Sequence, residues 1–534
     1  MAISTIKYDE HGKPKRAKYR IVALGNLDPT DWSKSDCYAP VMSLLELRLM
    51  TVLAIKKKRI LKCGDVKQAF CQAILPPNEQ YVLKPPPGCP ITPPNSYWML
   101  KRTLYGLKRS PRHWYEKAVS FLNTIGLQQC RHAPCLFKGY LIKGKPPIYL
   151  GLYVDDFVYF SESDEVEKLF ETKLSALTQV DFMGQVSHFL GIRFQWRQTK
   201  QNLQVHLSQQ AFTENLIQQA GLDNPSSSTN LTPYRSGYPI DSIKNVKMKS
   251  PEKEKLEHEL RSYVGSFLWL SQGTRPDIAT ITNILSKHQH NATPAHISAA
   301  KYVIKYLKGT KQFGITFNSN TDISISSFVH FPINSKEITG ITDANWGPQD
   351  QSKPIPGKIY PKLDIFKSRS ISGHLITFHG PLHWSSKRQK VTARSSAEAE
   401  IYATDHCVRD ILYLRNIMTD LNLLDETFAT KTPVYNDNMA CVMWSQSKTN
   451  KRMRHMQIPE NGVRENIKML DIKHIEGKIN PSDIFTKEDK DIAHFQTLRD
   501  TIVKPPLKNK LHQIQTQNSM SPENKNIDHR TSEK

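Results

Sequence analysis

The sequence predicts a chain of mixed α and β structure, with an α+β part followed by an α/β part. Aromatic and β-branched residues gather in short runs that are typical of strands, and the longest run lies around residues 148–160. Segments with helical periodicity separate these runs. After residue 338, strands that end in an acidic residue alternate with helical segments.

Length and charge limit the classes of partner. The chain has 534 residues, which corresponds to about three or four domains. Its formal net charge is +23 and its pI is near 9.5. A polyanion, most simply nucleic acid, is therefore the expected partner. No apolar run reaches membrane length, and residues 1–13 do not form a signal peptide, so we expect an intracellular protein.

The eight cysteines include no CxxC pair. This spacing argues against both a zinc ribbon and a disulfide framework. Cys130 and Cys135, with His132 between them, offer too few ligands for a metal site. We expect buried free thiols instead.

The apolar run around residues 148–160 is interrupted by two adjacent carboxylates, Asp155 and Asp156. Strand-forming residues on both sides place the pair at the tight turn of a β-hairpin. Carboxylates held together at the edge of a core repel each other and lose hydration. Mg²⁺ relieves both costs, because it binds one or two carboxylates together with substrate phosphates. The pattern indicates a two-metal site for phosphoryl transfer, and the alternative is an acidic surface turn.

Three segments before this hairpin have recognisable patterns. They are a basic hairpin over residues 7–20, a helix over 40–56 whose apolar stripe is interrupted by Arg48, and a strand leading into a helix over 60–70. Arg20 could clamp a triphosphate, or it could be a solvated cation at a strand end. Asp65, at the end of its strand, could join Asp155 and Asp156. Phe70 could lie under a nucleotide sugar and exclude a 2′-hydroxyl, or it could belong to the core.

Residues 97–125 are expected to form a strand, a turn and a helix. Gly106 and Pro111 punctuate the turn. Basic residues alternate with Tyr and Trp between residues 105 and 114, which suits a nucleic-acid strand through stacking and phosphate contacts. The alternative is a loop that caps the helix, with Trp114 in the core.

The next 150 residues are expected to be mainly helical. We predict helices over 162–178, 211–220 and 260–307, a strand over 189–194 and a linker over 223–257 rich in Pro, Ser and charge. His288, His290 and His296 could bind a metal, but the spacing of a zinc motif is absent. Exposed histidines on helices and loops are the simpler interpretation.

A second series of acids begins with Asp343, at the end of a strand over 338–346. Further strands are expected over 375–384, 434–437 and 470–475, with a helix from Ser395 to about residue 421 and a short helix carrying Asp483. Glu398 has a structural role in a capping box with Ser395. Glu400 lies two turns before Cys407 on the core-facing stripe. Together with Asp437 and Asp483, Asp343 and Glu400 could surround two metal ions, although each alone could be a solvated end or cap.

These motifs, in this order, resemble the reverse transcriptase and ribonuclease H of Ty1/copia-type retrotransposon Pol polyproteins. The resemblance extends from about Lys13 to Lys487 and rests on the following segments: Asp65-Val-Lys-Gln-Ala-Phe70, Tyr105-Gly-Leu-Lys108 with Pro111, Arg112 and Trp114, Tyr153-Val-Asp-Asp156, Phe189-Leu-Gly191, Tyr263-Val-Gly265, Thr274-Arg-Pro-Asp-Ile278, Tyr306-Leu-Lys-Gly-Thr310, Ser395-Ser-Ala-Glu-Ala-Glu400 and Ser482-Asp-Ile-Phe-Thr-Lys487.

The resemblance implies an α+β right-hand polymerase with fingers, palm and thumb, followed by an α/β ribonuclease-H-like domain. We expect fingers and palm over residues 1–222, truncated at the N-terminus relative to the family. A linker, thumb and connection helices would follow over 223–335, then the ribonuclease-H-like domain over 336–500 and a disordered tail over 501–534.

The resemblance also assigns roles. Asp65, Asp155 and Asp156 would bind two Mg²⁺ ions, one near the primer 3′-hydroxyl and one on the incoming triphosphate. Asp343, Glu400, Asp437 and Asp483 would bind the metals that cleave RNA in an RNA–DNA hybrid, with His474 as a weaker candidate for assisting product departure. Mn²⁺ is an alternative ion. Nucleotide contacts would come from Arg20, Phe70, Tyr105 and Gly106, and primer contacts from Phe189, Leu190 and Gly191.

The expected partners are an RNA or DNA template, a DNA or RNA primer, an RNA–DNA hybrid and dNTPs, without a membrane. The family implies a cytoplasmic virus-like particle, with the nucleus as an alternative. Departures from the family pattern include Arg109 in place of Gln, a long segment between Asp343 and Ser368, and Pro459 and Gly462 in a stretch they should interrupt. The alternative function is therefore an inactive nucleic-acid-binding relic with the same fold.

Overall fold

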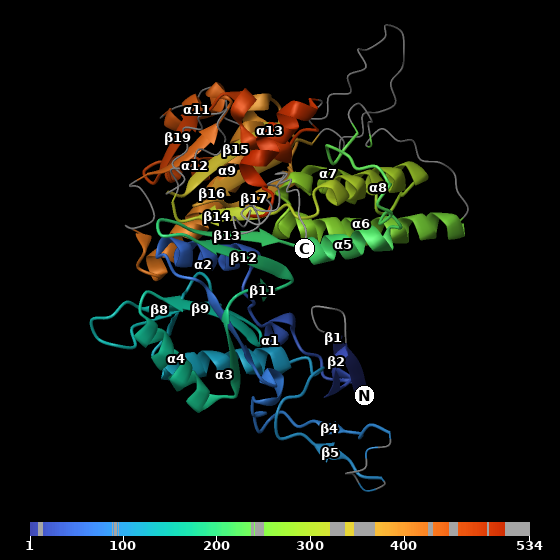
Figure 1. Cartoon of the computed structure of the whole chain (residues 1–534), viewed down its shortest axis with the longest axis vertical. Coiled ribbons are helices and arrows are strands. Elements are labelled where there is room, and N and C mark those ends of the chain that lie inside the picture. Colours follow the sequence, from blue (N-terminus) through green and yellow to red (C-terminus); the bar gives the residue numbers. More distant parts are fainter. Residues whose placement is uncertain are drawn as a thin grey trace, which may run out of the picture.

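The computed structural model describes residues 1–8, 14–87, 89, 93, 95–235, 240, 250–320, 337–346, 369–424, 431–447, 458–488 and 491–507. The turn of the predicted N-terminal hairpin, the middle of the predicted linker, the long segment after Asp343 and most of the predicted tail lie outside these residues. Figure 1 shows the described elements in chain order.

The N-terminal region is built from small elements. They are β1 (Ala2–Tyr8), β2 (Pro14–Ile21), η1 (Gly25–Leu27), α1 (Lys34–Cys37), η2 (Ala69–Cys71), β4 (Val82–Leu83) and β5 (Trp98–Met99). β1 and β2 pair in antiparallel fashion, as the predicted basic hairpin requires. β4 and β5 form a second two-stranded sheet.

A six-stranded sheet forms the centre of the first half of the chain. Its order is β10 (Val180–Gln185), β3 (Lys62–Val66), β9 (Asp156–Ser161), β8 (Ile148–Tyr153), β7 (Leu136–Gly139) and β6 (Gln128–Gln129). Helix α2 (Leu44–Lys56) packs with Tyr149, Val158 and Phe160 in one core. Helices α3 (Ser110–Thr124) and α4 (Asp164–Leu177) pack with the alternate residues of the same strands in a second core. This alternation buries the sheet on both faces, which explains the nearly continuous apolar run in β8 and β9.

A second sheet and four helices follow. Its strands are β11 (His188–Phe189), β12 (Ile192–Gln198), β13 (Leu203–Ser208) and β14 (Ile315–Asn318), and the helices are α5 (Gln210–Gln219), α6 (Ser250–Gly273), α7 (Ala279–Ser286) and α8 (Pro294–Gly309), with η4 (Pro276–Ile278) before α7. The sheet joins strands from both sides of the predicted boundary at residue 222, because β13 pairs with β14. The predicted linker ends earlier than expected, since α6 already begins at Ser250.

Three predicted elements need correction in this half of the chain. The strand predicted over 189–194 is divided by a turn at Leu190 and Gly191, which both have positive φ, at 48° and 69°; Phe189 ends β11 and Ile192 begins β12. Asp156 is the first residue of β9, so the tight turn consists of Val154 and Asp155. His296 is buried and not exposed, and its Nδ1 accepts a hydrogen bond from the Thr293 backbone at the start of α8, 3.1 Å away.

The C-terminal unit is a five-stranded mixed sheet with helices. The strand order is β17 (Pro381–Arg388), β16 (Ile371–Thr377), β15 (Thr339–Asn345), β18 (Thr432–Asn436) and β19 (Leu470–His474). The first three strands are antiparallel, and β15, β18 and β19 are parallel. The remaining elements are α9 (Ser396–Asp420), α11 (Met439–Gln446), α12 (Ile458–Glu465), η5 (Gly477–Ile479), η6 (Pro481–Phe485) and α13 (Ile492–Ile502).

Two predictions for the C-terminal unit were wrong in detail. The single strand predicted over 375–384 belongs to a hairpin, in which His379 and Gly380 adopt positive φ between β16 and β17. Pro459 and Gly462 do not interrupt the local element, since both lie in α12. Pro459 is the second residue of that helix, where its missing N–H costs no hydrogen bond.

The C-terminal unit packs against helix α2, and Arg48 is at the contact. Its guanidinium lies 4.2 Å from the ring centroid of Trp384 in β17, and its Nη1 donates to the carbonyls of Gln272 and Gly273 at the end of α6, at 2.8 and 3.0 Å. Arg48 therefore interrupts the apolar stripe of α2 because it joins three parts of the molecule. A cation at a helix C-terminus also complements the helix dipole.

Candidate functional site

The first acidic cluster lies where β3 and β9 meet. Asp65 and Asp156 are directly opposite each other in the antiparallel pair, and the Val66 N–H donates to the Asp155 carbonyl, 2.8 Å away. Side chains that face each other in this way lie on one face of a sheet with Cβ atoms about 4.5–5.5 Å apart. The structure thus brings Asp65 to the hairpin of Asp155 and Asp156, although these residues are about 90 positions apart in the sequence.

All three aspartates are partly exposed at this place. They are not among the groups of three acidic, His or Cys residues in the described chain whose ligand atoms all lie within 4.8 Å of one another. The backbone therefore positions them, and rotation of their side chains would complete a cation site. Half-exposed carboxylates beside a core are suitable oxygen ligands for Mg²⁺.

The hairpin turn is strained and is braced by a tryptophan. Val154 has φ of +57°, which is unfavourable for a β-branched residue. Trp114, buried in α3, donates from Nε1 to the Val154 carbonyl at 2.7 Å. A helix on the face of the sheet thus holds the turn that carries Asp155. Sequence analysis gave Trp114 only a core or a nucleic-acid role and missed this contact, because no local pattern shows it.

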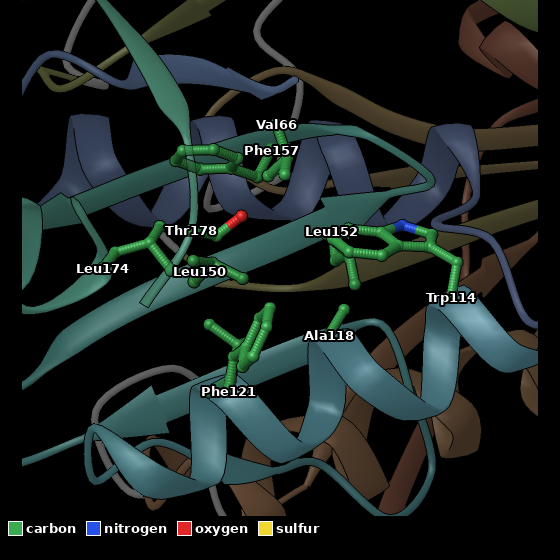
Figure 2. A pocket seen from close by; sticks show the side chains of 10 residues that line it. Val66, Trp114, Ala118, Phe121, Leu150, Leu152, Phe157, Leu174 and Thr178 are labelled. Atoms are coloured by element: carbon green, nitrogen blue, oxygen red, sulfur yellow. The ribbon is translucent and has the colours of Figure 1, made fainter. Parts of the chain in front are cut away.

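A small apolar cavity of about 20 Å³ lies beside this brace (Figure 2). Trp114, Ala118 and Phe121 of α3 line it from one side, and Leu150, Leu152 and Phe157 of the six-stranded sheet line it from the other. Its lining is apolar and it has room for about one water, so a dry cavity is expected. It is a packing defect and not a substrate pocket.

The predicted nucleotide contacts gather around Tyr105. Phe70 meets its ring edge-to-face at 5.4 Å between centroids, and the Arg20 guanidinium lies 5.7 Å from its centroid. Burial raises the pKa of Tyr105, and the nearby groups Cys71, Asp155 and Asp65 raise it further. The aromatic group and the first acidic cluster are therefore neighbours.

Two further observations concern Arg20 and Gly106, which are among the predicted nucleotide-binding residues. Arg20 Nε is buried without a hydrogen-bond partner. Gly106 has φ of +92°, and a Cβ there would lie 2.1 Å from the Ala23 carbonyl oxygen. Only glycine allows this close approach of residues 23 and 106, which is secured by a hydrogen bond from the Ala23 N–H to the Tyr105 carbonyl at 2.7 Å.

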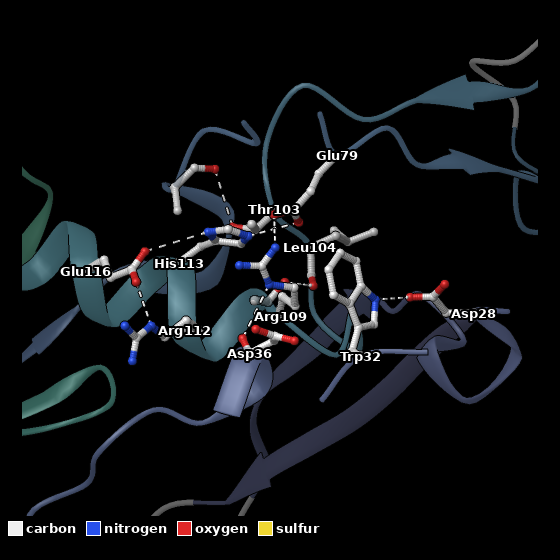
Figure 3. Close-up of polar contacts among 12 residues, drawn as sticks. Asp28, Trp32, Asp36, Glu79, Thr103, Leu104, Arg109, Arg112, His113 and Glu116 are labelled. Carbon is white, nitrogen blue, oxygen red and sulfur yellow. Dashed lines mark hydrogen bonds and ion pairs between the residues drawn. The ribbon is translucent and has the colours of Figure 1, made fainter. Parts of the chain in front are cut away.

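The basic residues between positions 105 and 114 make internal contacts (Figure 3). Arg109 pairs with buried Glu79, which also contacts His113 Nε2 at 3.0 Å. The Arg109 guanidinium stacks 4.6 Å from the centroid of Trp32. Lys108 donates to the Asp28 carbonyl at 3.1 Å. These contacts support the structural alternative, in which the segment caps α3, over a strand-binding surface.

The predicted primer residues are divided between core and surface. Phe189 is buried, Leu190 is half-buried and Gly191 is exposed at the turn. Only the turn itself is therefore available to a bound strand.

The second acidic cluster is more compact. Asp343 at the end of β15, Glu400 in the first turns of α9 and Asp437 just after β18 place one carboxylate oxygen each within 4.8 Å of one another. Asp343 and Glu400 are buried. Asn436 Nδ2 donates to Glu400 Oε2 at 3.0 Å. Adjacent parallel strands that end in acids at one edge of a sheet, with a helix start beside them, create this geometry.

Asp483, the fourth predicted acid, is connected to the cluster through a lysine. Lys487 Nζ lies 3.2 Å from Asp343 Oδ1 and 3.1 Å from Asp483 Oδ1, and Thr486 Oγ1 donates to Asp343 Oδ2. Sequence analysis quoted Lys487 within a motif but gave it no role. It supplies positive charge beside two of the four acids.

Burial and mutual repulsion raise the pKa values in the second cluster. Burial is the main cause for Glu400, followed by Asp343 and Asp437, and its pKa is well above the usual range. Burial and then Asp343 raise the pKa of Asp437 and bring that of Asp483 to about 7. Carboxylates whose ionisation is opposed by burial and by one another have the chemistry of a divalent metal site. The exposed His474 accompanies them, with Nε2 3.2 Å from the Asp437 carbonyl oxygen.

Comparisons with known proteins support the resemblance of the N-terminal part of the chain to a reverse transcriptase. Residues 2–234 match the family model described as reverse transcriptase (RNA-dependent DNA polymerase), so this part of the chain is a reverse transcriptase domain. The chain is 27% identical over 490 residues to the retrovirus-related Pol polyprotein from transposon RE1 of Arabidopsis thaliana and 26% identical over 488 residues to that from transposon TNT 1-94 of Nicotiana tabacum.

The chain is similar to a region of Ty1/copia-type retrotransposon Pol polyproteins. The alignments cover 91% and 90% of this chain, but the chain spans only 30% and 34% of the two relatives. A solved foamy viral protease–reverse transcriptase in complex with double-stranded DNA matches 89% of this chain and 66% of its own, at 12% identity and a TM-score of 0.42. In the described residues, no helix has both the length and the apolar character needed to cross a membrane.

The brace on the hairpin can be tested by Trp114→Phe, which removes the donor to Val154 and keeps an aromatic ring. Leaving a buried carbonyl without its partner costs about 1–3 kcal/mol. We expect nucleotide incorporation on a primer–template to slow by about tenfold, because the turn that carries Asp155 loses its support. Tyr115→Phe is the matched control, since Tyr115 on the same helix donates to the Pro134 carbonyl at 3.0 Å and not to the hairpin turn. Equal rates for the two variants would contradict the brace.

The repulsion in the second cluster can be tested by thermal unfolding of Asp437→Asn in EDTA. The folded state retains protons between pH 3.8 and about 7 that the unfolded state releases, so the cluster destabilises the fold as pH rises through this range. We expect the variant to have a higher Tm than wild type at about pH 8. Each kcal/mol of electrostatic repulsion that the substitution removes should raise Tm by about 2–4 °C. The difference should shrink at about pH 5 and with Mg²⁺. The control is Asp471→Asn, which changes a half-exposed aspartate of β19. A similar rise in Tm for this control, or a lower Tm for Asp437→Asn, would contradict the proposed repulsion.

Proposed function

We propose that this chain is an RNA-directed DNA polymerase with ribonuclease H activity and uses two separate divalent-metal sites. The observation that carries the proposal is the meeting of distant acids in two places, Asp65 with Asp155 and Asp156, and Asp343 with Glu400 and Asp437. The reverse transcriptase family supports the first activity. The mixed sheet with acids at the ends of its strands supports the second.

In the proposed polymerase site, Asp65, Asp155 and Asp156 would hold Mg²⁺, or Mn²⁺ as a substitute. Bound divalent cations would neutralise the phosphates and favour the attacking form of the primer hydroxyl. Arg20, whose Nε has no hydrogen-bond partner, would bind the triphosphate. Phe70, against Tyr105, would lie where a nucleotide sugar passes and would discriminate against a 2′-hydroxyl.

In the proposed ribonuclease site, Asp343, Glu400, Asp437 and Asp483 would hold the cations. Asn436 orients Glu400, and Thr486 orients Asp343. Lys487 would favour the ionised form of Asp483, although burial and Asp343 still raise the pKa of this carboxyl to about 7. The substrate would be the RNA strand of an RNA–DNA hybrid, in keeping with an intracellular polymerase of net charge +23.

The polymerase assignment predicts that the purified chain extends a DNA primer on an RNA template with Mg²⁺. Asp155→Asn should reduce extension by at least about 10³-fold, because one carboxylate of the metal site is lost. Asp164→Asn is the control, since Asp164 is exposed at the start of α4 and pairs with Arg59, which precedes β3 at the end away from Asp65. Wild-type protein that folds and binds primer–template but does not extend it would favour the inactive relic.

The division into two sites predicts that Asp437→Asn abolishes cleavage of a labelled RNA–DNA hybrid but leaves primer extension within about twofold of wild type. The reason is that Asp437 contacts the second cluster only. Asp155→Asn should show the reverse pattern. Loss of both activities in either folded variant would contradict two independent sites.

A further inference from the structure

A second group of potential metal ligands lies on the C-terminal unit, away from the acids. His374 of β16, His383 of β17 and Asp410 of α9 each place one ligand atom within 4.8 Å of the others. Asp410 follows Glu400 by ten residues on the same helix, which corresponds to about 15 Å along its axis. His374 and His383 are diagonal neighbours across the β16–β17 pair, since Ile376 is opposite His383. Three regular elements thus hold the group.

The distances suit a tetrahedral ion. His374 Nε2 lies 3.0 Å and His383 Nε2 3.3 Å from Asp410 Oδ2. Zinc bonds of about 2.0–2.1 Å at tetrahedral angles place neighbouring ligand atoms about 3.3 Å apart. The side chains therefore need little movement to bind zinc.

One nitrogen of each imidazole is buried without a well-oriented hydrogen bond. His374 is 3% exposed, and its Nε2 has no hydrogen-bond partner despite its short distance to Asp410. His383 Nδ1 is also buried without a partner. Buried polar nitrogens of this kind cost free energy, and a metal would satisfy the one that points at Asp410.

The chemistry of the donors and their surroundings selects the metal. Two imidazole nitrogens and one carboxylate oxygen converge at this place in the C-terminal unit. Zinc takes these ligands. Arg48 is close enough to affect His383. The positive charge of Arg48 disfavours any cation at this place. Mg²⁺ prefers oxygen ligands and would be held weakly here, so it is disfavoured more than a tightly bound transition metal.

We propose that His374, His383 and Asp410 form a zinc site that fastens the β16–β17 hairpin to α9. Three protein ligands leave a fourth position for water, and Asp410 has a side chain that is 37% exposed, so ions can enter from solvent. Trp384, the next residue of β17, points to the opposite face of the strand, where it contacts Arg48 of α2. Zinc would therefore fix the face of the hairpin that packs against α9.

The test is titration of the metal-free full chain with Co²⁺, which reports tetrahedral nitrogen ligation by visible absorption. The background is Asp343→Asn with Asp437→Asn, so that the acidic cluster does not contribute. We expect one equivalent of Co²⁺ to give the bands, one equivalent of Zn²⁺ to remove them, and saturating Zn²⁺ to raise Tm by at least about 3 °C.

His383→Gln should abolish both the bands and the zinc-dependent rise in Tm. His132→Gln is the matched control, because His132 forms a similar contact with Asp420 at 2.9 Å on the surface and should leave both unchanged. If His383→Gln does not fold, zinc-edge X-ray absorption of the wild-type chain decides, with two imidazole ligands expected. Absent bands, bands that persist in folded His383→Gln, or zinc with no imidazole ligands would overturn the proposal.

Discussion

The architecture depends on carboxylates that the backbone forces together. Pairing of β3 with β9 sets Asp65 opposite Asp156, and the parallel pairing of β15 with β18 brings Asp343 and Asp437 to one sheet edge. Like charges in such positions destabilise a fold, and burial adds a desolvation cost. The divalent cations that we propose for both sites would offset this cost.

Much of the remaining structure serves to hold these positions. The first cluster lies on strands of a sheet that is buried on both faces. Trp114 donates a hydrogen bond to the hairpin turn of this cluster. The helices between the two clusters are fixed by buried Arg275, whose Nη2 donates to Asp277 Oδ2 at 2.7 Å and whose Nη1 donates to the Thr310 carbonyl at 2.9 Å. Tyr306 adds a third contact to Asp277, at 2.6 Å. This fully satisfied network explains why the motifs around residues 274–278 and 306–310 occur together, and its members are individually costly to remove.

The sequence was a good guide to local structure. The periodicity of residues 44–56, the capping residue Ser395 and the apolar run around 148–160 predicted elements that the structure contains. Turns were harder to predict from the sequence. Leu190 and His379 adopt positive φ, which is unusual for both residue types. Pro459 misled for the opposite reason, since a proline in the first turn of a helix is tolerated.

The site was predicted only in part. Acids at strand ends could be found from the pattern, and the structure brings six of the seven into two groups, with Asp483 joined through Lys487. Some features of the site depend on tertiary contacts between residues far apart in the chain, and no local sequence pattern predicts them. They are the hydrogen bond from Trp114 to the hairpin turn, the unpartnered Nε of Arg20 and the contacts of Arg48. The internal use of Lys108 and Arg109 also needed the structure, because a basic segment looks the same whether it faces phosphate or Glu79.

The most direct test of two separate metal sites is anomalous diffraction from crystals of the full chain grown with Mn²⁺, a chain-terminated primer–template and dNTP. Manganese peaks are expected both beside Asp65, Asp155 and Asp156 and beside Asp343, Glu400 and Asp437. Ordered acids without a peak at the first position would contradict the polymerase site, and the same result at the second would contradict the ribonuclease site.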